Sequence, residues 1–168
     1  MALPKLGYPT YELELPSTGK SVKFRPFLVK EEKVLLLALE SEDDKQITAA
    51  VKDLIKNCVI SRIKVETLPL FDLEYLFLKI RGASIGETIT INVTCLDDNE
   101  TKAETTINID DIEVFKPEGH TNKIELTDEM GIVMKYPSMK RFIELDFLQK
   151  ELDAEEVFEL ISESIDQI

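Results

Sequence analysis

The sequence has little of the residue types on which most enzyme active sites depend. Its 168 residues include one histidine, two cysteines and no tryptophan, and its six glycines are isolated from one another. Isolated glycines cannot form a phosphate-binding loop or a dinucleotide-binding fingerprint. A zinc site needs about four ligands, whereas Cys58, Cys95 and His120 are scattered along the chain. We therefore expect no metal site, no cofactor and no nucleotide chemistry.

Basic residues are fewer than acidic ones. The 20 Lys and Arg residues against 33 Asp and Glu residues give a formal net charge of -13 at pH 7. This charge repels nucleic acid phosphates and anionic lipid, and the few aromatic residues fall on apolar stripes instead of forming a stacking platform. We expect neither nucleic acid nor a membrane as a partner. A protein partner and a homo-oligomer both remain open.

Long apolar runs are also absent. The densest one, residues 68–80, is interrupted by charged residues and is too short to span a bilayer. The first eight residues carry no apolar segment of a secretory signal. The two cysteines, Cys58 and Cys95, lie in unrelated contexts and are expected to be buried free thiols. A reducing cytoplasm is therefore the expected folding compartment.

The N-terminal half predicts a β-hairpin followed by three helices. Apolar and charged residues alternate over 11–15 and 22–25, on either side of the turn residues 16–19. Apolar residues then recur at helical spacing in three stretches. These stretches are 30–39, 47–58 and 67–81, with a cap at 41–44 for the second and Gly82 as the end of the third.

The C-terminal half predicts strands and then helices. A period of two over 87–95 and 104–109, around an acidic turn, indicates an antiparallel hairpin. Further short strands are expected near 111–114 and 122–126. A helix start at Pro137-Ser138 and a second cap at Asp153–Glu156 precede a heptad-like stripe that reaches Ile168.

The fold class expected from these elements is α+β. It comprises an N-terminal β-hairpin packed with three helices, a central antiparallel β-hairpin or small sheet, and two C-terminal helices. The predicted domains are an N-terminal hairpin and helical lobe at 1–84, a β subdomain at 85–136, and C-terminal helices at 137–168. We expect these last helices to pack back on the first lobe and form one compact unit.

The titratable residues do not form a convincing catalytic set. His120 follows Pro117-Glu118-Gly119 in a polar loop, which orients a base poorly, and no nucleophile-elbow pattern is present. The acidic turn at 97–100 lacks the alternating oxygens and central glycine of an EF-hand loop. Asp110, Asp111 and Glu113 are expected to be solvated charges. We expect no catalytic residues, and a small acidic metal-dependent enzyme is the alternative from another class.

Several segments resemble the baseplate hub protein family of T-even-like contractile-tailed bacteriophages. They are YELELPSTGK at 11–20, VKFRPFLVKEEK at 22–33, FDLEYLFLKIR at 71–81 with SIG at 84–86, and KYPSM at 135–139. The resemblance implies a late-expressed phage protein that acts in baseplate assembly through contacts with other baseplate or tail hub proteins. Some relatives carry paired cysteines around the turn of the central hairpin. This chain has only Cys95 there, so no metal site is carried over.

The resemblance leaves two roles open. A hub subunit would pass from the host cytoplasm into the baseplate of the virion, whereas a transient tail assembly chaperone would be absent from the virion. Stoichiometry, symmetry and the contacting subunit are not fixed by the sequence.

Two segments are candidates for the protein interface. The first is a basic hairpin on an acidic protein, and the second is the final apolar stripe, which has no glycine, asparagine or proline stop signal. An open strand edge can be extended by another chain, although a hairpin can also simply cover its own core. The missing stop is compatible with docking on a partner or with a chain that continues past its last residue. The candidate residues are Lys20, Lys23, Phe24, Arg25, Leu160, Ile161, Ile165 and Ile168.

Overall fold

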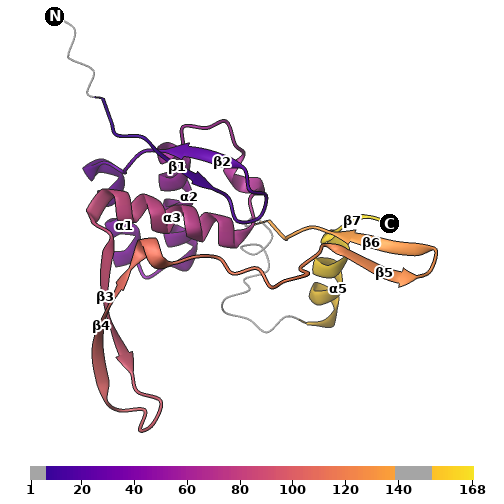
Figure 1. Ribbon diagram of the computed structural model, residues 1–168. Helices are drawn as coiled ribbons and strands as arrows, with labels where there is room; N and C mark the ends of the chain where they lie inside the picture. Colours follow the sequence, from indigo (N-terminus) through magenta and orange to yellow (C-terminus); the bar gives the residue numbers. More distant parts are fainter. Residues whose placement is uncertain (1–6, 139–152) are drawn as a thin grey trace, which may run out of the picture. The chain divides into compact units, whose positions relative to one another are not determined.

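The computed structural model describes residues 7–138 and 153–168 (Figure 1). The described residues contain four α-helices and seven strands, and the strands form three small sheets. The chain divides into two compact units. Unit 1 comprises residues 1–62 and 74–114, and unit 2 comprises residues 63–73 and 115–168.

Unit 1 begins with the predicted hairpin. Strands β1 (Tyr11–Glu14) and β2 (Ser21–Phe24) pair antiparallel. Between them Gly19 adopts a φ of 68°, a conformation that favours glycine, and its N–H donates to the carbonyl of Leu15 at 2.8 Å. Leu15, which follows β1, is buried together with alternate residues of β2, as a period of two requires.

Three helices follow the hairpin along the chain. They are α1 (Val29–Glu40), α2 (Asp44–Cys58) and α3 (Leu70–Ile85), and the last of these begins in unit 2 and continues in unit 1. The side chain of Asp43 caps α2, because it accepts hydrogen bonds from the N–H groups of Lys45 and Gln46. The cap therefore lies within the stretch that the sequence indicated.

Gly82 does not end α3, contrary to the sequence prediction. The helix continues to Ile85, and the glycine that follows it is Gly86, with a φ of 134°. A Cβ added at Gly82 would lie 3.4 Å from a methyl group of Ile109. That distance is an ordinary van der Waals contact, so Gly82 lies inside the helix without a strict need for glycine, whereas the positive φ that favours glycine is found at Gly86.

The second hairpin of unit 1 consists of β3 (Thr88–Thr94) and β4 (Lys102–Asn108). The two strands pair over their full length, with Ile89 opposite Ile107. A 3₁₀ turn at Ile109–Asp111 follows, so the short strand expected near 111–114 is not formed. The side chain of Asn108 accepts a hydrogen bond from the N–H of Asp110 and favours the turn over an extended chain.

The core of unit 1 unites the first hairpin, the helices and this turn. Its buried apolar residues are Leu15, Val22, Phe24, Phe27, Ala38, Ala50, Leu54, Ile55, Cys58, Leu76, Ile80 and Ile109.

The described residues of unit 2 form a three-stranded sheet, a helix and the start of α3. The sheet has the order β5-β6-β7, all antiparallel. Its elements are β5 (Lys123–Thr127), β6 (Met130–Met134), α5 (Ala154–Glu163) and β7 (Ile165–Gln167). A 3₁₀ turn at Val65–Thr67 belongs to the same unit.

The predicted α+β layout is wrong. The strands form three separate sheets instead of one hairpin and one central sheet. The second predicted C-terminal helix begins at its predicted cap, where Asp153 and Glu156 form a capping box, but it ends at Glu163 and the strand β7 follows it. The helix α5 stops at Glu163 because the backbone of Ile165–Gln167 pairs with the edge of β6. Apolar spacing records only side chains, so it could not show that this backbone had a strand to pair with. Of the first predicted C-terminal helix, residues 139–152 lie outside the described residues.

Candidate protein interface

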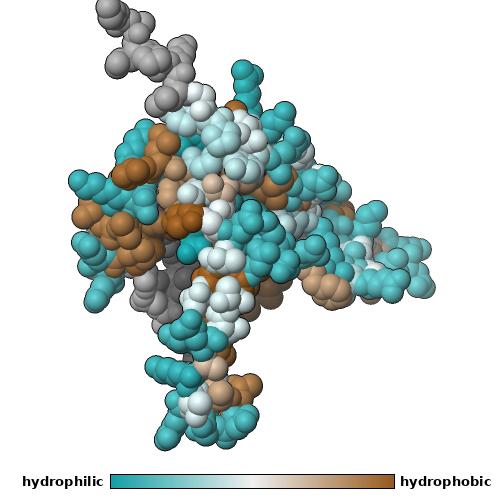
Figure 2. All heavy atoms as spheres, turned by 60° about the vertical axis from the view of Figure 1, so that its left-hand side comes forward, coloured by the Kyte–Doolittle hydropathy of each residue, from teal (hydrophilic) through white to brown (hydrophobic). Residues whose placement is uncertain are grey.

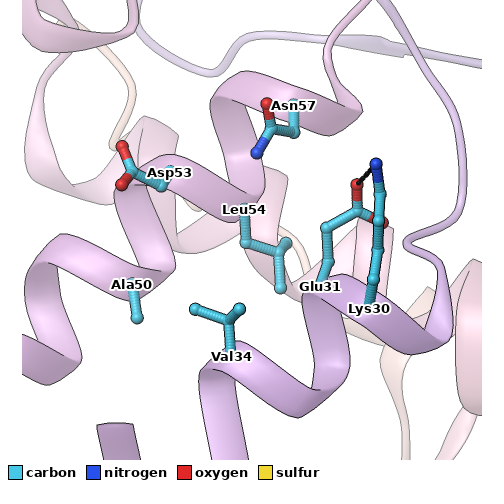
Figure 3. A pocket seen from close by; sticks show the side chains of 7 residues that line it. All are labelled: Lys30, Glu31, Val34, Ala50, Asp53, Leu54 and Asn57. Carbon is cyan, nitrogen blue, oxygen red and sulfur yellow. Dashed lines mark ion pairs between the residues drawn. The ribbon is translucent and has the colours of Figure 1, made fainter.

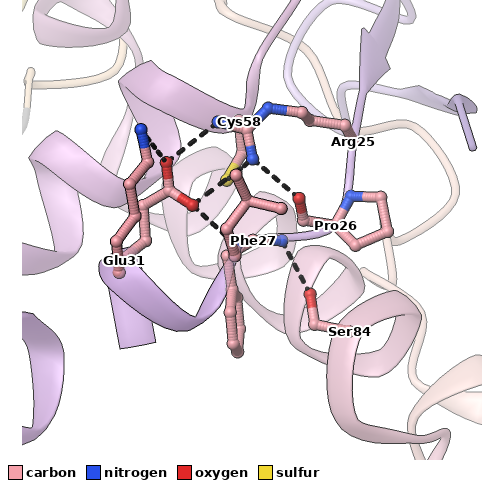
Figure 4. A network of polar contacts seen from close by, with 8 residues as sticks. Arg25, Pro26, Phe27, Glu31, Cys58 and Ser84 are labelled. Carbon is pink, nitrogen blue, oxygen red and sulfur yellow. Dashed lines mark hydrogen bonds and ion pairs between the residues drawn. The ribbon is translucent and has the colours of Figure 1, made fainter. Parts of the chain in front are cut away.

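Arg25 is a candidate interface residue, but its side chain is engaged within unit 1. Its Nη2 lies 2.9 Å from Oε1 of Glu31, and the two side chains are 14% and 5% exposed. Its Nη1 donates to the carbonyl of Pro26 at 2.8 Å (Figure 4). The same figure shows the N–H of Phe27 donating to Oγ of Ser84 at 2.9 Å. Arg25 therefore joins the hairpin to α1.

The electrostatics of this network stabilise an ionised pair. Burial acts to raise the pKa of Glu31, but hydrogen bonds from Arg25 and from the N–H of Leu28 outweigh it and lower the pKa. The hydrogen bond with Glu31 in turn raises the pKa of Arg25. Burial raises the pKa of the nearby Cys58 thiol to about 11, against the attraction of Arg25. Cys58 is therefore a protonated core residue at neutral pH.

Of the four candidate residues on the first hairpin, only the two lysines face solvent. Lys20 and Lys23 are exposed, whereas Phe24 is 3% exposed. The ring of Phe24 stacks on the ring of Tyr11, with 5.6 Å between the two ring centroids. The outer edge of β2 is also occupied, because the carbonyl of Lys23 accepts a hydrogen bond from the N–H of Ile60 at 2.8 Å. Another chain cannot add to this edge without displacing that bond.

A groove lies along the other strand of the hairpin, β1. It has a volume of about 380 Å³, and β1 and α3 contribute most of its lining. Four carboxylates line it, from Glu12, Glu14, Glu87 and Asp110. The Nζ of Lys79 lies 3.6 Å from Oδ1 of Asp110, with which it forms an ion pair, and it also lies over the ring of Tyr75. The groove is therefore acidic, and the only strand that pairs with β1 in the described sheets is β2.

Helix α1 exposes several apolar side chains. Val34 and Leu39 belong to the stretch of helical apolar spacing predicted at 30–39, and they are 55% and 49% exposed. Leu36 and Leu37 are 53% and 57% exposed. The signal in the sequence was the run of three leucines at 35–37, because consecutive apolar residues occupy more than one side of a helix. Figure 2 shows apolar side chains, in brown, exposed on the face of the molecule that it draws.

A shallow groove separates α1 from α2. It has a volume of about 220 Å³ and is bounded by Lys30, Glu31, Val34, Ala50, Asp53, Leu54 and Asn57 (Figure 3). Aliphatic side chains from both helices form the floor, and polar side chains lie at its rim. Such a groove can accept an apolar side chain of another protein chain.

The C-terminal candidates do not form one continuous stripe. Leu160 lines a groove of about 360 Å³ in unit 2, and Ile161 is 53% exposed on α5. Ile165 is half-buried in β7, and Ile168 lies beyond that strand and is 87% exposed. The stripe is interrupted at Ser164, whose N–H donates to Leu160 and Ile161 and whose carbonyl accepts from Lys135 at 2.8 Å.

The described residues do not bring the titratable side chains considered for catalysis or metal binding together into one site. His120 shares a hydrogen bond of 2.8 Å with the hydroxyl of Tyr136, and Tyr136 meets the ring of Phe71 edge-on. Within 7–138 and 153–168, His, Cys, Asp and Glu side chains form no group of three or more that could hold a metal ion. Within the same residues no helix is long and apolar enough to cross a membrane.

Comparison with known proteins gives one match. The model of a protein family described as "T4 bacteriophage base plate protein" matches residues 8–168. No curated protein and no solved structure matches the chain.

Proposed function

The chain belongs to the T4 bacteriophage base plate protein family, and from this premise we propose that it acts in assembly of the tail baseplate hub through protein contacts. Its partners are other baseplate or tail hub proteins. It folds in the host cytoplasm and is retained in the baseplate of the virion. It works without a cofactor and catalyses no reaction.

The observation that carries the proposal is the exposure of helix α1. Val29, Val34, Leu36, Leu37 and Leu39 are each between 49% and 80% exposed. A helix that is apolar on most sides is normally buried, and a contiguous apolar patch on a protein surface marks a site of interaction. A protein built to assemble with other subunits has a reason to keep such a helix uncovered until it meets its partner.

The proposal is tested first by following the chain through infection. A tagged full-length chain is recovered from infected cells and from purified phage particles, and bound proteins are identified and counted by mass spectrometry. We expect other baseplate proteins in the lysate complex and a fixed number of copies of the chain in every particle. A chain that binds hub proteins in the lysate but is missing from particles would be a transient assembly chaperone. Recovery without any baseplate protein would refute both roles.

The contribution of α1 is tested with matched variants of the same helix. Leu36→Glu with Leu37→Glu places charge on the exposed apolar face, and we expect at least about ten-fold less recovery of baseplate partners. The control is Lys33→Gln, which alters an exposed polar position on the same helix. Equal recovery of partners by both variants would remove α1 from the interface.

The basic hairpin needs a test that avoids its structural arginine. Lys20→Glu with Lys23→Glu reverses two exposed charges and leaves the Arg25–Glu31 pair intact. If the hairpin meets an acidic partner, this variant associates more slowly at low salt, and the difference shrinks as salt is added. Unchanged association rates would exclude the lysines from the interface.

A further inference from the structure

The β3–β4 hairpin, residues 88–108, is anchored firmly at its base. Ile109, which follows β4, is fully buried and lies against Gly82 of α3. The ammonium group of Lys79 donates to the carbonyls of Ile109 and Asp110 at 2.9 and 3.4 Å. The N–H of Ile109 also donates to the carbonyl of Glu87 at 2.6 Å, which closes the base of the hairpin. The base of the hairpin is therefore held against α3 by both packing and hydrogen bonds.

Beyond this base the hairpin extends away from the helices of unit 1 (Figure 1). The register places Ile89 opposite Ile107 and Val93 opposite Ala103, with Ile91 between these two pairs. Residues directly opposite each other in an antiparallel pair share a face. One face of the hairpin is therefore apolar except for Thr105, which lies opposite Ile91, and the other face carries threonine, asparagine and charged residues.

The apolar face is largely uncovered. Ile91, Val93 and Ile107 are 38%, 46% and 36% exposed. An isolated two-stranded hairpin is marginally stable in water and normally packs its apolar face against another element. We infer that a partner covers this face in the functional assembly.

Charge indicates what kind of partner this is. From 87 to 111 the sequence has seven acidic residues and one basic residue. Six of the acidic residues lie at the ends of the hairpin: Asp97, Asp98 and Glu100 at the tip, and Glu87, Asp110 and Asp111 at the base. Glu104 lies on the polar face, opposite Asn92. A complementary surface has an apolar centre with Lys or Arg on both sides of it.

The same charges disfavour two other occupants. A second copy of this chain would bring an identical acidic hairpin and repel the first. Unit 2 of the same chain has fifteen acidic residues against seven basic ones, so it is also a poor counterpart. The lone lysine, Lys102, lies opposite Thr94 at the far end of the strands and does not change this balance.

We propose that the β3–β4 hairpin is a docking arm whose Ile89, Ile91 and Val93 face is covered by a different baseplate protein with a basic rim. This inference rests on the proposed function and names the chemistry of one contact within it. Unit 1 would then have two contact surfaces for partners, one on α1 and the other on the β3–β4 hairpin.

The test places a photo-cross-linker on each face of the same strand. Full-length chains carrying Ile91→p-benzoylphenylalanine or Thr90→p-benzoylphenylalanine are expressed in infected cells, irradiated, and the cross-linked peptides are sequenced. We expect the Ile91 variant to cross-link to another baseplate protein, at an apolar segment flanked by Lys or Arg, at least about ten-fold more than the Thr90 variant.

Each other result would overturn the inference. The inference would be wrong if the Ile91 variant cross-linked to a second copy of this chain, to unit 2 of the same chain, or to a surface without basic residues. It would also be wrong if the two variants gave equal yields of cross-linked product. If baseplate proteins are recovered with both variants, the proposed function holds even where the cross-links contradict the inference about the hairpin. Loss of those proteins from both variants and from the unmodified chain would refute the proposed function itself.

Discussion

The guanidinium of Arg25 and the carboxylate of Glu31 lie 2.9 Å apart, with the carboxylate side chain only 5% exposed. Arg25 follows β2, and Glu31 lies in the first turn of α1, where its carboxylate also accepts a hydrogen bond from the N–H of Leu28 at 2.6 Å. One ion pair therefore determines how the first hairpin meets the first helix. Removal of Arg25 would leave the buried carboxylate of Glu31 with the N–H of Leu28 and the exposed ammonium group of Lys30 as partners.

The first prediction concerns this pair. Arg25→Met should lower the free energy of unfolding by about 3 kcal/mol, because the buried carboxylate of Glu31 would lose its closest ionic partner. Lys30→Met removes an exposed charge 3.7 Å from the same carboxylate and should change stability by less than about 0.5 kcal/mol. Urea unfolding of both variants measures the difference. Similar values for the two variants would contradict a structural role for the Arg25–Glu31 pair.

The pair also predicts a dependence of stability on pH. The folded state lowers the pKa of Glu31 from its ordinary value of 4.5, so the stabilisation is present above that value and is lost as pH falls through the lowered one. Glu31→Gln should therefore unfold with a weaker pH dependence than the unmodified chain below pH 4.5. Unfolding curves of both proteins across this range test the prediction.

The second prediction concerns the two thiols. Cys58 is fully buried and its pKa is raised to about 11, whereas Cys95 is only half-buried. At neutral pH a thiol reagent such as Ellman's reagent should modify one cysteine in the folded protein and both in denaturant. The Cys95→Ser variant should react only as it unfolds. Rapid reaction of that variant would show that Cys58 is accessible.

The third prediction concerns the base of the hairpin arm. Ile109→Ala should lower the free energy of unfolding by about 2 to 5 kcal/mol, because it opens a cavity beside α3. Ile107→Ala, at a position that is 36% exposed, is the matched control and should cost clearly less. Gly82→Ala should be tolerated, because its new Cβ would approach Ile109 no closer than 3.4 Å. Thermal unfolding of the three variants measures these effects.

The fourth prediction concerns the tip of the arm. Hydrogen bonds from the hydroxyl of Thr101, from its N–H and from the N–H of Glu100 lower the pKa of Asp98 to about 2. Thr101→Val removes the largest of these contributions and should raise the pKa of Asp98 toward its ordinary value of 3.8. An NMR titration of the Asp98 carboxyl group reports this directly. An identical pKa in both proteins would contradict the hydrogen-bonded turn.

The same hydrogen bonds stabilise the turn only while Asp98 is ionised. Because its folded pKa is lowered, the contribution is present above 3.8 and disappears as pH falls through about 2.

Periodicity located several elements well because their apolar and polar side chains recur at the spacing of a strand or a helix. The first hairpin, the capped helix α2 and the strands β3 and β4 were predicted close to their observed positions. In each case the apolar spacing and the turn or cap residues agree with one another. That agreement between local signals is what a single sequence can report.

Local signals were insufficient where a distant segment decided the outcome. Gly82 looked like a helix stop, but it lies inside α3 beside the buried Ile109, and the helix continues to Ile85. The leucines at 36 and 37 matched a helix but gave no information about which side would be covered. Among the interface candidates, Phe24 and Arg25 are engaged within the chain, while Lys20, Lys23, Ile161 and Ile168 are exposed.

The sequence by itself determined the acidic charge, the positions of the best-patterned helices and strands, and the segments that resemble baseplate hub proteins. Only the tertiary structure decided that the last residues pair with β6 as a strand, that Arg25 faces Glu31, and that the apolar faces of α1 and the β3–β4 arm remain uncovered. The physical reason is that pairing and burial depend on which backbone and side-chain groups meet across the fold, and spacing along the chain does not contain that information.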